Sequence, residues 1–474
     1  MAETSRSFLK KFIGFSLVTW ISFGMSFITA PISTRLFAPE ILGKINIFNT
    51  YSNLFGILIL LGLDQAFARF YLERPNGRSK GYLFTFCFSV TYTLLFVSAI
   101  VAFPIQDFLS KILFQEEDNL LLWLLMGSVF CSATLRYLNL SYRMEQNIAL
   151  FTIQGVLMTF VSKVLYIGVG FWDASYRLAL IVLTLSHLLL ALIFLFIQRK
   201  RFEPLAEYDK SFTKEMLKYA APLIPVSILM WANTSIPQVV IQHTMDYSSI
   251  GVFTSAISLA NLILIIQAGF NTFWVPYTYE NYKTQTGQFY KVHKYLICAV
   301  VIFALAIINA QDVIFLLLGE KYRAAKEFFP FLIMGPVCYI IGETTGIGID
   351  LSKKTYLNLV VFVMSVLANL CLCMVLGFAL GLPGIAMSSA IAAMISMILK
   401  SYFGGKNYKI VDSYKYVFAA MVLLMSAAFI TYLCDQILLK NAMVSILILL
   451  SLLYFRREIK ELSLYSISFL KKNK

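Results

Sequence analysis

The chain has 474 residues, of which 59% are hydrophobic, 15% aromatic and only 14% charged, and its mean hydropathy is +0.76. Soluble domains carry about 25% charged residues, so this composition excludes a soluble globular protein and predicts a polytopic, all-α membrane protein. The net charge of +14 does not indicate nucleic acid as a partner, because the positive residues lie in short loops between apolar segments and no soluble domain displays them.

Apolar segments of about twenty residues, the length that a helix needs to cross the hydrocarbon core, recur along the whole chain. The first of them is longer than the apolar core of a signal peptide, so we expect it to be retained as a helix. We expect about fourteen spanning helices, of which the last is short, at residues 12–34, 45–71, 82–105, 119–138, 149–172, 178–198, 219–243, 249–276, 294–318, 327–349, 357–380, 383–403, 415–435 and 441–456.

Lys and Arg residues are concentrated in alternate loops. If the N-terminus is cytoplasmic, the cytoplasmic segments hold 29 of these residues, Lys400 among them, and the external segments hold 8, with Arg69 and Lys163 left inside spans. Positive residues accumulate on the cytoplasmic side of membrane proteins. We therefore expect both termini to be cytoplasmic.

The longest charged connection separates two groups of six helices. We expect an N-terminal six-helix lobe at 1–198, a cytoplasmic linker at 199–218, a second six-helix lobe at 219–403, and two additional helices with a basic cytoplasmic tail at 404–474. The end of that tail, 456–474, is amphipathic and basic, which suits either an anionic membrane surface or partner enzymes.

The two lobes are predicted to be repeats. A shift of 208 residues places Gly43 on Gly251, Arg35 on His243, and the loop at 143–147 on the loop at 351–355. An even number of helices in each repeat predicts parallel repeats, related by an axis along the membrane normal.

Lys163 is the most informative polar residue, because an ionisable group inside a span usually faces a cavity or a partner. It lies roughly 20 Å from the start of its predicted helix at about 1.5 Å per residue, too deep to reach the cytoplasmic interface. We expect it to face a cavity, with snorkelling or a structural carboxylate partner as the alternative. His187, in the middle of the next predicted helix, is a weaker candidate, since a lone histidine is more often a hydrogen-bonded packing residue.

Charged residues also gather at the predicted cytoplasmic part of the second helix. Asp64, Arg69 and Glu73 are spaced within a few turns, and either carboxylate could neutralise Arg69. The functional hypothesis is a charged cytoplasmic entrance that receives an anion. Arg136 either belongs to this entrance or only fixes the orientation of its helix in the membrane. Arg35 lies at the external end of the first helix, where a gate is a reasonable hypothesis.

Further candidates lie in both lobes. Glu343, within the tenth predicted helix, and Asp350, at its cytoplasmic end, could carry a proton or pair with a basic residue, as could Asp64 and His187. Trp20 and Trp231 lie deep in their helices, where an indole ring could stack on a sugar, although core packing is the commoner role. The seven cysteines lie in or beside apolar segments, so we expect no disulfide, no metal and no cofactor.

Three segments carry a resemblance to a known family: PISTRLFAPEILGKINIF at 31–48, LGLDQAFARFY at 61–71 and LLGEKYRAAKEFFPFLIMG at 317–335. They resemble the Wzx-type O-antigen flippases, in the polysaccharide-transporter branch of the multidrug/oligosaccharidyl-lipid/polysaccharide exporter superfamily. The resemblance covers most of the chain. Its motifs are helix and loop patterns and contain no catalytic signature.

The resemblance implies a bacterial inner-membrane flippase for an undecaprenyl-diphosphate-linked oligosaccharide, used for O-antigen or a related surface polysaccharide. It also implies two six-helix lobes around a central cavity that opens alternately to either side, and partners such as a polysaccharide polymerase and a chain-length regulator. Basic residues in such a cavity bind the diphosphate, and Lys163, Arg69 and Arg35 match that role best here.

Two other classes of function remain as alternatives. A cation or drug antiporter of the same superfamily should carry a carboxylate in its first or seventh helix, and neither 12–34 nor 219–243 contains Asp or Glu. A membrane-embedded glycan polymerase or ligase should carry a large external loop, whereas the longest external loops expected here, near 106–119 and 319–326, have fewer than about twenty residues.

Overall fold

The computed structural model describes residues 2–73, 77–204, 209–282, 286–409 and 411–461, so residues 462–474 of the predicted basic tail lie outside the described part. The chain divides into two compact units, Met1–Ser235 and Ile236–Lys474, called here the N-terminal and C-terminal units. Thirteen helices in the described part are long and apolar enough to cross a membrane, or fourteen if the bent pair α2 and α3 counts as one span. This confirms the predicted fold class.

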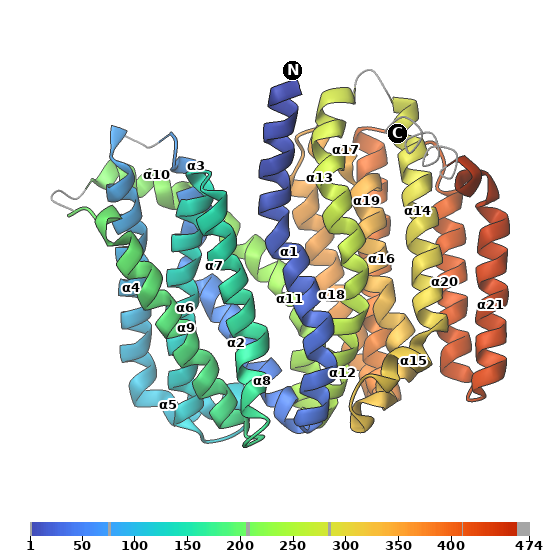
Figure 1. Cartoon of the computed structure of the whole chain (residues 1–474), viewed down its shortest axis with the longest axis horizontal. Coiled ribbons are helices and arrows are strands. Elements are labelled where there is room, and N and C mark those ends of the chain that lie inside the picture. The colour runs from blue at the N-terminus through green and yellow to red at the C-terminus, as the bar shows by residue number, and fades with distance from the viewer. Residues whose placement is uncertain (1, 74–76, 205–208, 283–285, 410, 462–474) are drawn as a thin grey trace. The chain divides into compact units, whose positions relative to one another are not determined.

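The N-terminal unit is built only from helices in its described residues (Figure 1). Its elements are α1 (Ala2–Leu36), α2 (Pro39–Leu60), α3 (Leu63–Phe70), α4 (Lys80–Ala102), α5 (Gln106–Phe114), α6 (Asn119–Met144), α7 (Ile148–Phe160), a π-helical turn (Val161–Leu165), α8 (Tyr166–Val169), α9 (Tyr176–Gln198), α10 (Lys210–Ala220) and α11 (Leu223–Thr244), which continues into the C-terminal unit.

The C-terminal unit is likewise helical where it is described. Its elements are α12 (Tyr247–Ala260), α13 (Leu264–Asn281), α14 (Thr286–Asn309), α15 (Gln311–Leu316), a 3-10 helix (Glu320–Glu327), α16 (Phe329–Thr345), α17 (Ile347–Leu351), α18 (Tyr356–Leu380), α19 (Leu382–Asn407), α20 (Lys415–Leu433) and α21 (Ile437–Tyr454). Within this unit, α16 packs against both α14 and α19.

Helix boundaries recur at the predicted shift of 208 residues. Helix α1 ends at Leu36 and α2 begins at Pro39. At the corresponding junction, α11 ends at Thr244 and α12 begins at Tyr247. The junction before α7, which begins at Ile148, likewise corresponds to the junction before α18, which begins at Tyr356. The positions of these two junctions agree with the predicted repeat.

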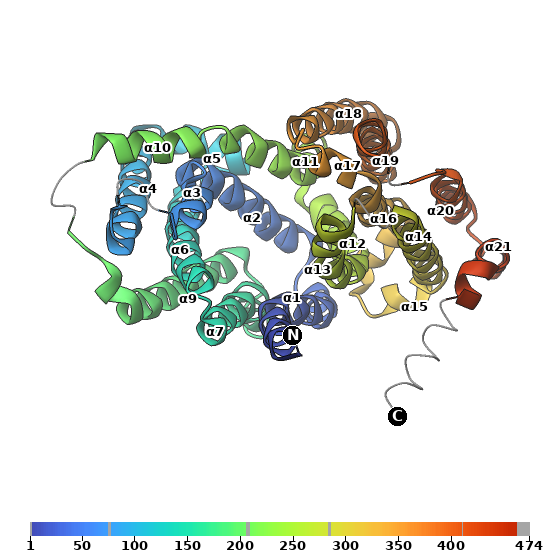
Figure 2. The same cartoon turned by 90° about the horizontal axis from the view of Figure 1, so that it is seen from above.

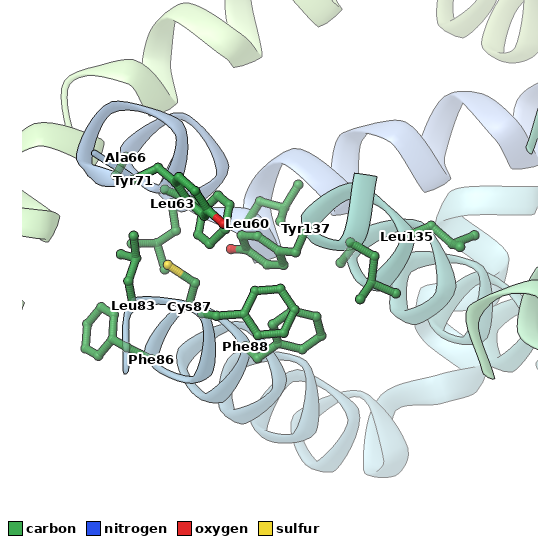
Figure 3. Packing of buried hydrophobic residues seen from close by; sticks show 14 of the residues in the cluster. Leu60, Leu63, Ala66, Tyr71, Leu83, Phe86, Cys87, Phe88, Leu135 and Tyr137 are labelled. Atoms are coloured by element: carbon green, nitrogen blue, oxygen red, sulfur yellow. The ribbon is translucent and has the colours of Figure 1, made fainter. Parts of the chain in front are cut away.

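The core of the N-terminal unit lies where α3, α4 and α6 meet. Leu63 and Ala66 of α3 pack with Cys87 of α4 and Tyr137 of α6, and all four side chains are fully or almost fully buried (Figure 3). Figure 2, in which the long helices are seen from their ends, shows α6 between α4 and α9. A buried aromatic and aliphatic core of this kind fixes α3 and α6 relative to each other.

Two segments predicted as connections are helical instead. The segment 106–119, expected as an external loop, contains α5, and the linker 199–218 contains a 3-10 turn at Arg199–Arg201 and most of α10. The linker forms a helix because Phe212, Met216 and Ala220 recur every four residues on one face, and all three are fully buried in the N-terminal unit. The sequence prediction missed this amphipathic pattern because the charged residues between these positions dominate the segment.

The predicted helix 45–71 is broken in the structure. Leu61 and Gly62 adopt left-handed backbone angles, with φ of 47° and 71°, and the axes of α2 and α3 differ by 54°. Gly62 also lies against the backbone of α10, where a Cβ atom would be 2.8 Å from the carbonyl oxygen of Ala220. The break is therefore tied to the docking of α10.

We expect the substitution Gly62→Ala to destabilise the protein by about 2 kcal/mol or more, because alanine disfavours the left-handed conformation and its Cβ would collide with Ala220. Titration with SDS, followed by circular dichroism, measures the loss. Gly77→Ala is the matched control: its φ is 63° but its surroundings are open, so it should lose only the conformational part. Equal losses in both variants would contradict the packing role of Gly62.

Candidate functional site

Lys163 lies inside the spanning segment Ile148–Val169 and is bonded to α1. Its Nζ donates a hydrogen bond of 3.2 Å to the carbonyl oxygen of Ser22 and a second to Oγ of Ser26. Among the described residues, no carboxylate forms an ion pair with Lys163. Serine and carbonyl oxygens solvate an ammonium group but do not neutralise it, so the described residues supply Lys163 with hydrogen-bond acceptors but no counter-charge.

The backbone around Lys163 departs from the α-helical pattern. Val161–Leu165 form a π-helical turn, an element that often marks functional positions because it changes the directions of successive side chains. Lys163 contacts α1, whereas Oγ of the neighbouring Ser162 lies 3.0 Å from Nε2 of His187 on α9. The turn thus links the helix of Lys163 to two neighbouring helices.

His187 has a hydrogen-bond partner at each ring nitrogen. Its Nδ1 lies 2.8 Å from the carbonyl oxygen of Leu183, which can only accept, so Nδ1 carries a proton. In the neutral ring, Nε2 then accepts the hydroxyl proton of Ser162. This arrangement suits a packing histidine, the alternative that the sequence favoured.

Asp64 and Arg136 form an ion pair between α3 and α6. Both Nε and a terminal nitrogen of Arg136 bind Oδ2 of Asp64, at 2.6 and 2.5 Å. The Asp64 side chain is 7% exposed and that of Arg136 is 48% exposed, so the carboxylate is buried while the guanidinium keeps an open face. Arg69 pairs instead with Glu73 at 2.8 Å, on the surface. Of the two carboxylates that could neutralise Arg69, Glu73 forms the ion pair, and Asp64 pairs with Arg136 instead.

Tyr71, Glu145 and Arg201 form a polar cluster at the C-terminal ends of α3 and α6. Arg201 binds both carboxylate oxygens of Glu145, at 2.6 and 2.5 Å, and the hydroxyl of Tyr71 donates to Glu145 at 2.9 Å. Burial, together with the neighbouring Glu145 carboxylate, raises the pKa of Tyr71 to about 12. Tyr71 therefore remains a neutral donor at physiological pH and holds the linker turn against the N-terminal unit.

The remaining candidates of the N-terminal unit have separate surroundings. The indole Nε1 of Trp231 donates to the carbonyl oxygen of Thr50 at 3.0 Å, which ties α11 to α2. Trp20 is 42% exposed on α1, and Arg35 is exposed at the end of the same helix. The described hydrogen bonds of Lys163 do not include any of these residues. Of the predicted binding residues in this unit, Arg136 is paired with Asp64, and Lys163 is bonded to α1.

The candidates of the C-terminal unit lie on α16 and α17. Glu343 forms an ion pair of 3.9 Å with Lys400 of α19. Asp350 accepts a hydrogen bond of 3.2 Å from the side chain of Asn358, at the start of α18. Lys400, counted from the sequence among the basic residues of the cytoplasmic side, lies near the end of the predicted helix 383–403, and in the structure it lies within α19, seven residues before that helix ends at Asn407.

Comparisons with known proteins agree with this architecture. A family model described as "Polysaccharide biosynthesis protein" matches residues 8–281. No curated protein sequence matches the chain. The solved structure of the lipid II flippase MurJ in an inward closed conformation is 16% identical, with a TM-score of 0.70, and the alignment covers 94% of this chain and 99% of that one.

Two structures of a multidrug resistance MATE family transporter of the MOP superfamily are also similar. The outward-facing one is 15% identical with a TM-score of 0.54, covering 84% of this chain and 95% of that chain. The inward-facing one is 16% identical with a TM-score of 0.56, covering 81% and 94%. At these identities the likeness establishes the fold, and the fold agrees with the expectation from the sequence. The chain therefore belongs to the polysaccharide biosynthesis protein family and has the fold of the MOP-superfamily transporters.

Proposed function

We propose that the protein is a flippase that moves an undecaprenyl-diphosphate-linked oligosaccharide from the cytoplasmic to the periplasmic leaflet of a bacterial inner membrane. Transport proceeds by alternating access, and the product serves the synthesis of O-antigen or a related surface polysaccharide. Both termini are cytoplasmic, and a polysaccharide polymerase and a chain-length regulator are the expected partners. Family membership supports the polysaccharide part of this proposal.

The observation that carries the proposal is Lys163. Its ammonium group lies within a spanning segment, is held by Ser22 and Ser26, and forms no ion pair with a described carboxylate. A membrane-embedded cation of this kind is best matched by an anionic ligand that arrives and leaves, and a diphosphate supplies both the charge and the oxygen acceptors. Arg136, with its half-exposed guanidinium, is a second basic group in the same unit.

The membrane potential favours transport in the proposed direction. A diphosphate carries about two negative charges, and each gains roughly 2.3 kcal/mol per 100 mV when it moves outward across a membrane that is negative inside. Net outward transport of the anion over a complete cycle can therefore run with the membrane potential. The return of the unloaded, positively charged site is the step at which protons could contribute.

Two other functions rank lower. A cation antiporter should place a carboxylate in the first or seventh helix, but the spanning part of α1, Leu17–Leu36, and the helix α11 contain neither Asp nor Glu. A polymerase or ligase should have a large external segment for catalysis. The connections between α4 and α6 and between α14 and α16 are instead short and largely helical, containing α5, α15 and the 3-10 helix Glu320–Glu327.

A bacterium whose own lipid-linked oligosaccharide flippase is under conditional control tests the proposed function in cells. When that flippase is depleted, expression of this protein should restore surface polysaccharide and remove the accumulated lipid-linked oligosaccharide from the inner leaflet. Survival on cationic dyes, measured in the same strain, tests the antiporter. Resistance to dyes without any restoration of polysaccharide would contradict the flippase.

A further inference from the structure

The Lys400 side chain lies along α16 and extends toward the middle of the spanning segment. Beside α16, its Cβ is near Gly346, its Cδ is near Gly342, and its Nζ is near Glu343 and the ring of Tyr339. Along α16 the side chain therefore runs away from the nearer helix ends and toward the middle of the segment. A lysine that merely snorkelled would extend toward the nearest interface.

Small residues make room for this side chain. A Cβ atom at Gly346 would lie 3.3 Å from Cβ of Lys400, and one at Gly342 would lie 3.5 Å from its Cδ. Further along, a Cβ at Gly404 would lie 2.3 Å from the carbonyl oxygen of Thr345, so α16 and α19 are in close backbone contact. The aliphatic part of Lys400 thus lies in a groove of glycines that delivers the ammonium group to Glu343.

The ion pair at the end of this groove is loose and partly accessible. The distance from Nζ of Lys400 to the nearest carboxylate oxygen of Glu343 is 3.9 Å, longer than a hydrogen bond. The two side chains are 17% and 20% exposed. Nζ also lies 5.5 Å from the centre of the Tyr339 ring, within the range of a cation–π contact. Lys400 is therefore held by weak contacts that an incoming anion can replace.

The other ionisable groups around Glu343 on the packed elements have partners or lie apart. His293 of α14 is fully buried, and its Nδ1 is 2.8 Å from Oγ1 of Thr344. Cys338 contacts the sulfur of Met421 on α20, and Asp350 of α17 is bonded to Asn358. The charged 3-10 helix Glu320–Glu327 precedes α16, at the end opposite to Glu343. Tyr339, one turn before Glu343 on α16, also interacts with the Glu343 carboxylate, and Lys400 supplies the positive charge beside it.

We propose that Lys400 is an anion-binding residue in the C-terminal unit, that Glu343 occupies it when the protein is unloaded, and that phosphoryl oxygens of the transported lipid displace Glu343. This inference rests on the proposed function and adds a residue and a coupling step to it. The displaced carboxylate takes up one proton from water, which returns to water when the anion leaves and the ion pair reforms.

The proton follows from the cost of an isolated charge. While Lys400 binds Glu343, the two charges cancel within the spanning segment. If the ammonium group turns to a phosphoryl oxygen, the carboxylate loses the positive charge of Lys400, and protonation lowers the cost of keeping it within the spanning segment. Anion binding and proton uptake at Glu343 are therefore linked.

Binding of undecaprenyl diphosphate to the full-length protein in lipid nanodiscs tests the inference. The affinity of the wild type should increase as the pH falls, by up to about tenfold per pH unit for one linked proton, and a pH-indicator dye should report the uptake. Glu343→Gln should bind at least as tightly and lose both the pH dependence and the uptake. Lys400→Met should bind at least about tenfold more weakly, and Lys400→Arg should retain binding.

Two further variants keep the result interpretable. Glu343→Gln combined with Lys400→Met removes both charges, leaves neither unpaired, and should bind weakly without pH dependence. Lys406→Met is the matched control, because Lys406 is an exposed lysine on the last turn of the same helix and its loss should leave binding unchanged.

The outcomes separate this inference from the proposed function. A wild type that binds the diphosphate with an affinity unaffected by either variant that removes Lys400 would overturn the anion site alone. Proton uptake that persists in Glu343→Gln would place the proton elsewhere, at His293 for example, and would overturn the exchange. A wild type that neither binds undecaprenyl diphosphate nor flips its glycan derivative would overturn both.

Discussion

Replacing Lys163 with methionine is expected to slow the flipping of a diphosphate-linked glycan by about 30-fold or more while leaving the protein folded. A charge-assisted hydrogen bond contributes about 1.5–3 kcal/mol, which corresponds to roughly 10- to 150-fold in binding or rate. Methionine keeps the length and the apolar part of the side chain. No described carboxylate loses a partner, so the fold should tolerate the change.

Dithionite quenching of a fluorescent undecaprenyl-diphosphate-linked glycan in proteoliposomes measures the rate for Lys163→Met. Lys163→Arg should restore a large part of the activity, since it returns the charge. Lys111→Met is the matched control, because Lys111 is an exposed lysine paired with Glu117 and lies outside the proposed site. Wild-type flipping by a folded Lys163→Met protein would remove Lys163 from the binding site.

The second large effect is expected at Asp312, where the change acts on stability. Asp312 of α15 binds Lys326 at 3.2 Å and also accepts a hydrogen bond from Lys440 of α21, whose side chain is only 5% exposed. Replacing Asp312 with asparagine leaves the charge of Lys440 buried without a counter-charge. We expect a loss of about 3 kcal/mol in the free energy of unfolding, the size seen when one partner of a buried pair is removed.

SDS titration at neutral pH measures the loss for Asp312→Asn. Adding Lys440→Met to the same protein should recover most of it, because the buried charge is then absent. Asp435→Asn, an exposed carboxylate just before α21, is the control and should be nearly neutral. Equal stability of the wild type and Asp312→Asn would show that α21 does not depend on this pair.

The same carboxyl gives a pH dependence of known sign. Burial opposes the ionisation of Asp312, but hydrogen bonds from Lys440 and Lys326 outweigh burial and hold its pKa below the ordinary value. A lowered pKa in the folded state contributes stability above the pKa of the unfolded state, and this contribution is lost as the pH falls through the folded pKa. Acid sensitivity below about pH 4 should therefore be weaker in Asp312→Asn than in the wild type.

Much of the fold could be predicted because spanning helices follow from length and hydropathy alone. The break at Leu61–Gly62 could not, since it depends on two left-handed residues and on the contact between Gly62 and Ala220, which are distant in sequence. The spacing of Phe212, Met216 and Ala220 was a readable signal for α10, but the surrounding charges concealed it.

The candidate site was less predictable, because pairing between helices is invisible in a single sequence. The depth of Lys163 identified it as a candidate, but nothing in the sequence indicates the π-helical turn or the bonds to Ser22 and Ser26. Asp64 had Arg69 close in sequence, yet its partner is Arg136, brought to it by the packing of α3 on α6. Glu343 was a candidate whose basic partner the sequence did not identify, and the packing of α16 on α19 brings Lys400 to it.

The central claim is that this chain flips a diphosphate-linked glycan, and the flipping rate of the purified wild type in proteoliposomes tests it most directly. We expect the labelled undecaprenyl-diphosphate glycan in the inner leaflet to become accessible to dithionite much faster than in protein-free vesicles. The rate should increase when a potential is imposed that drives the anion outward. A rate equal to that of empty vesicles, together with uptake of a cationic dye by the same proteoliposomes, would contradict the flippase and favour the antiporter.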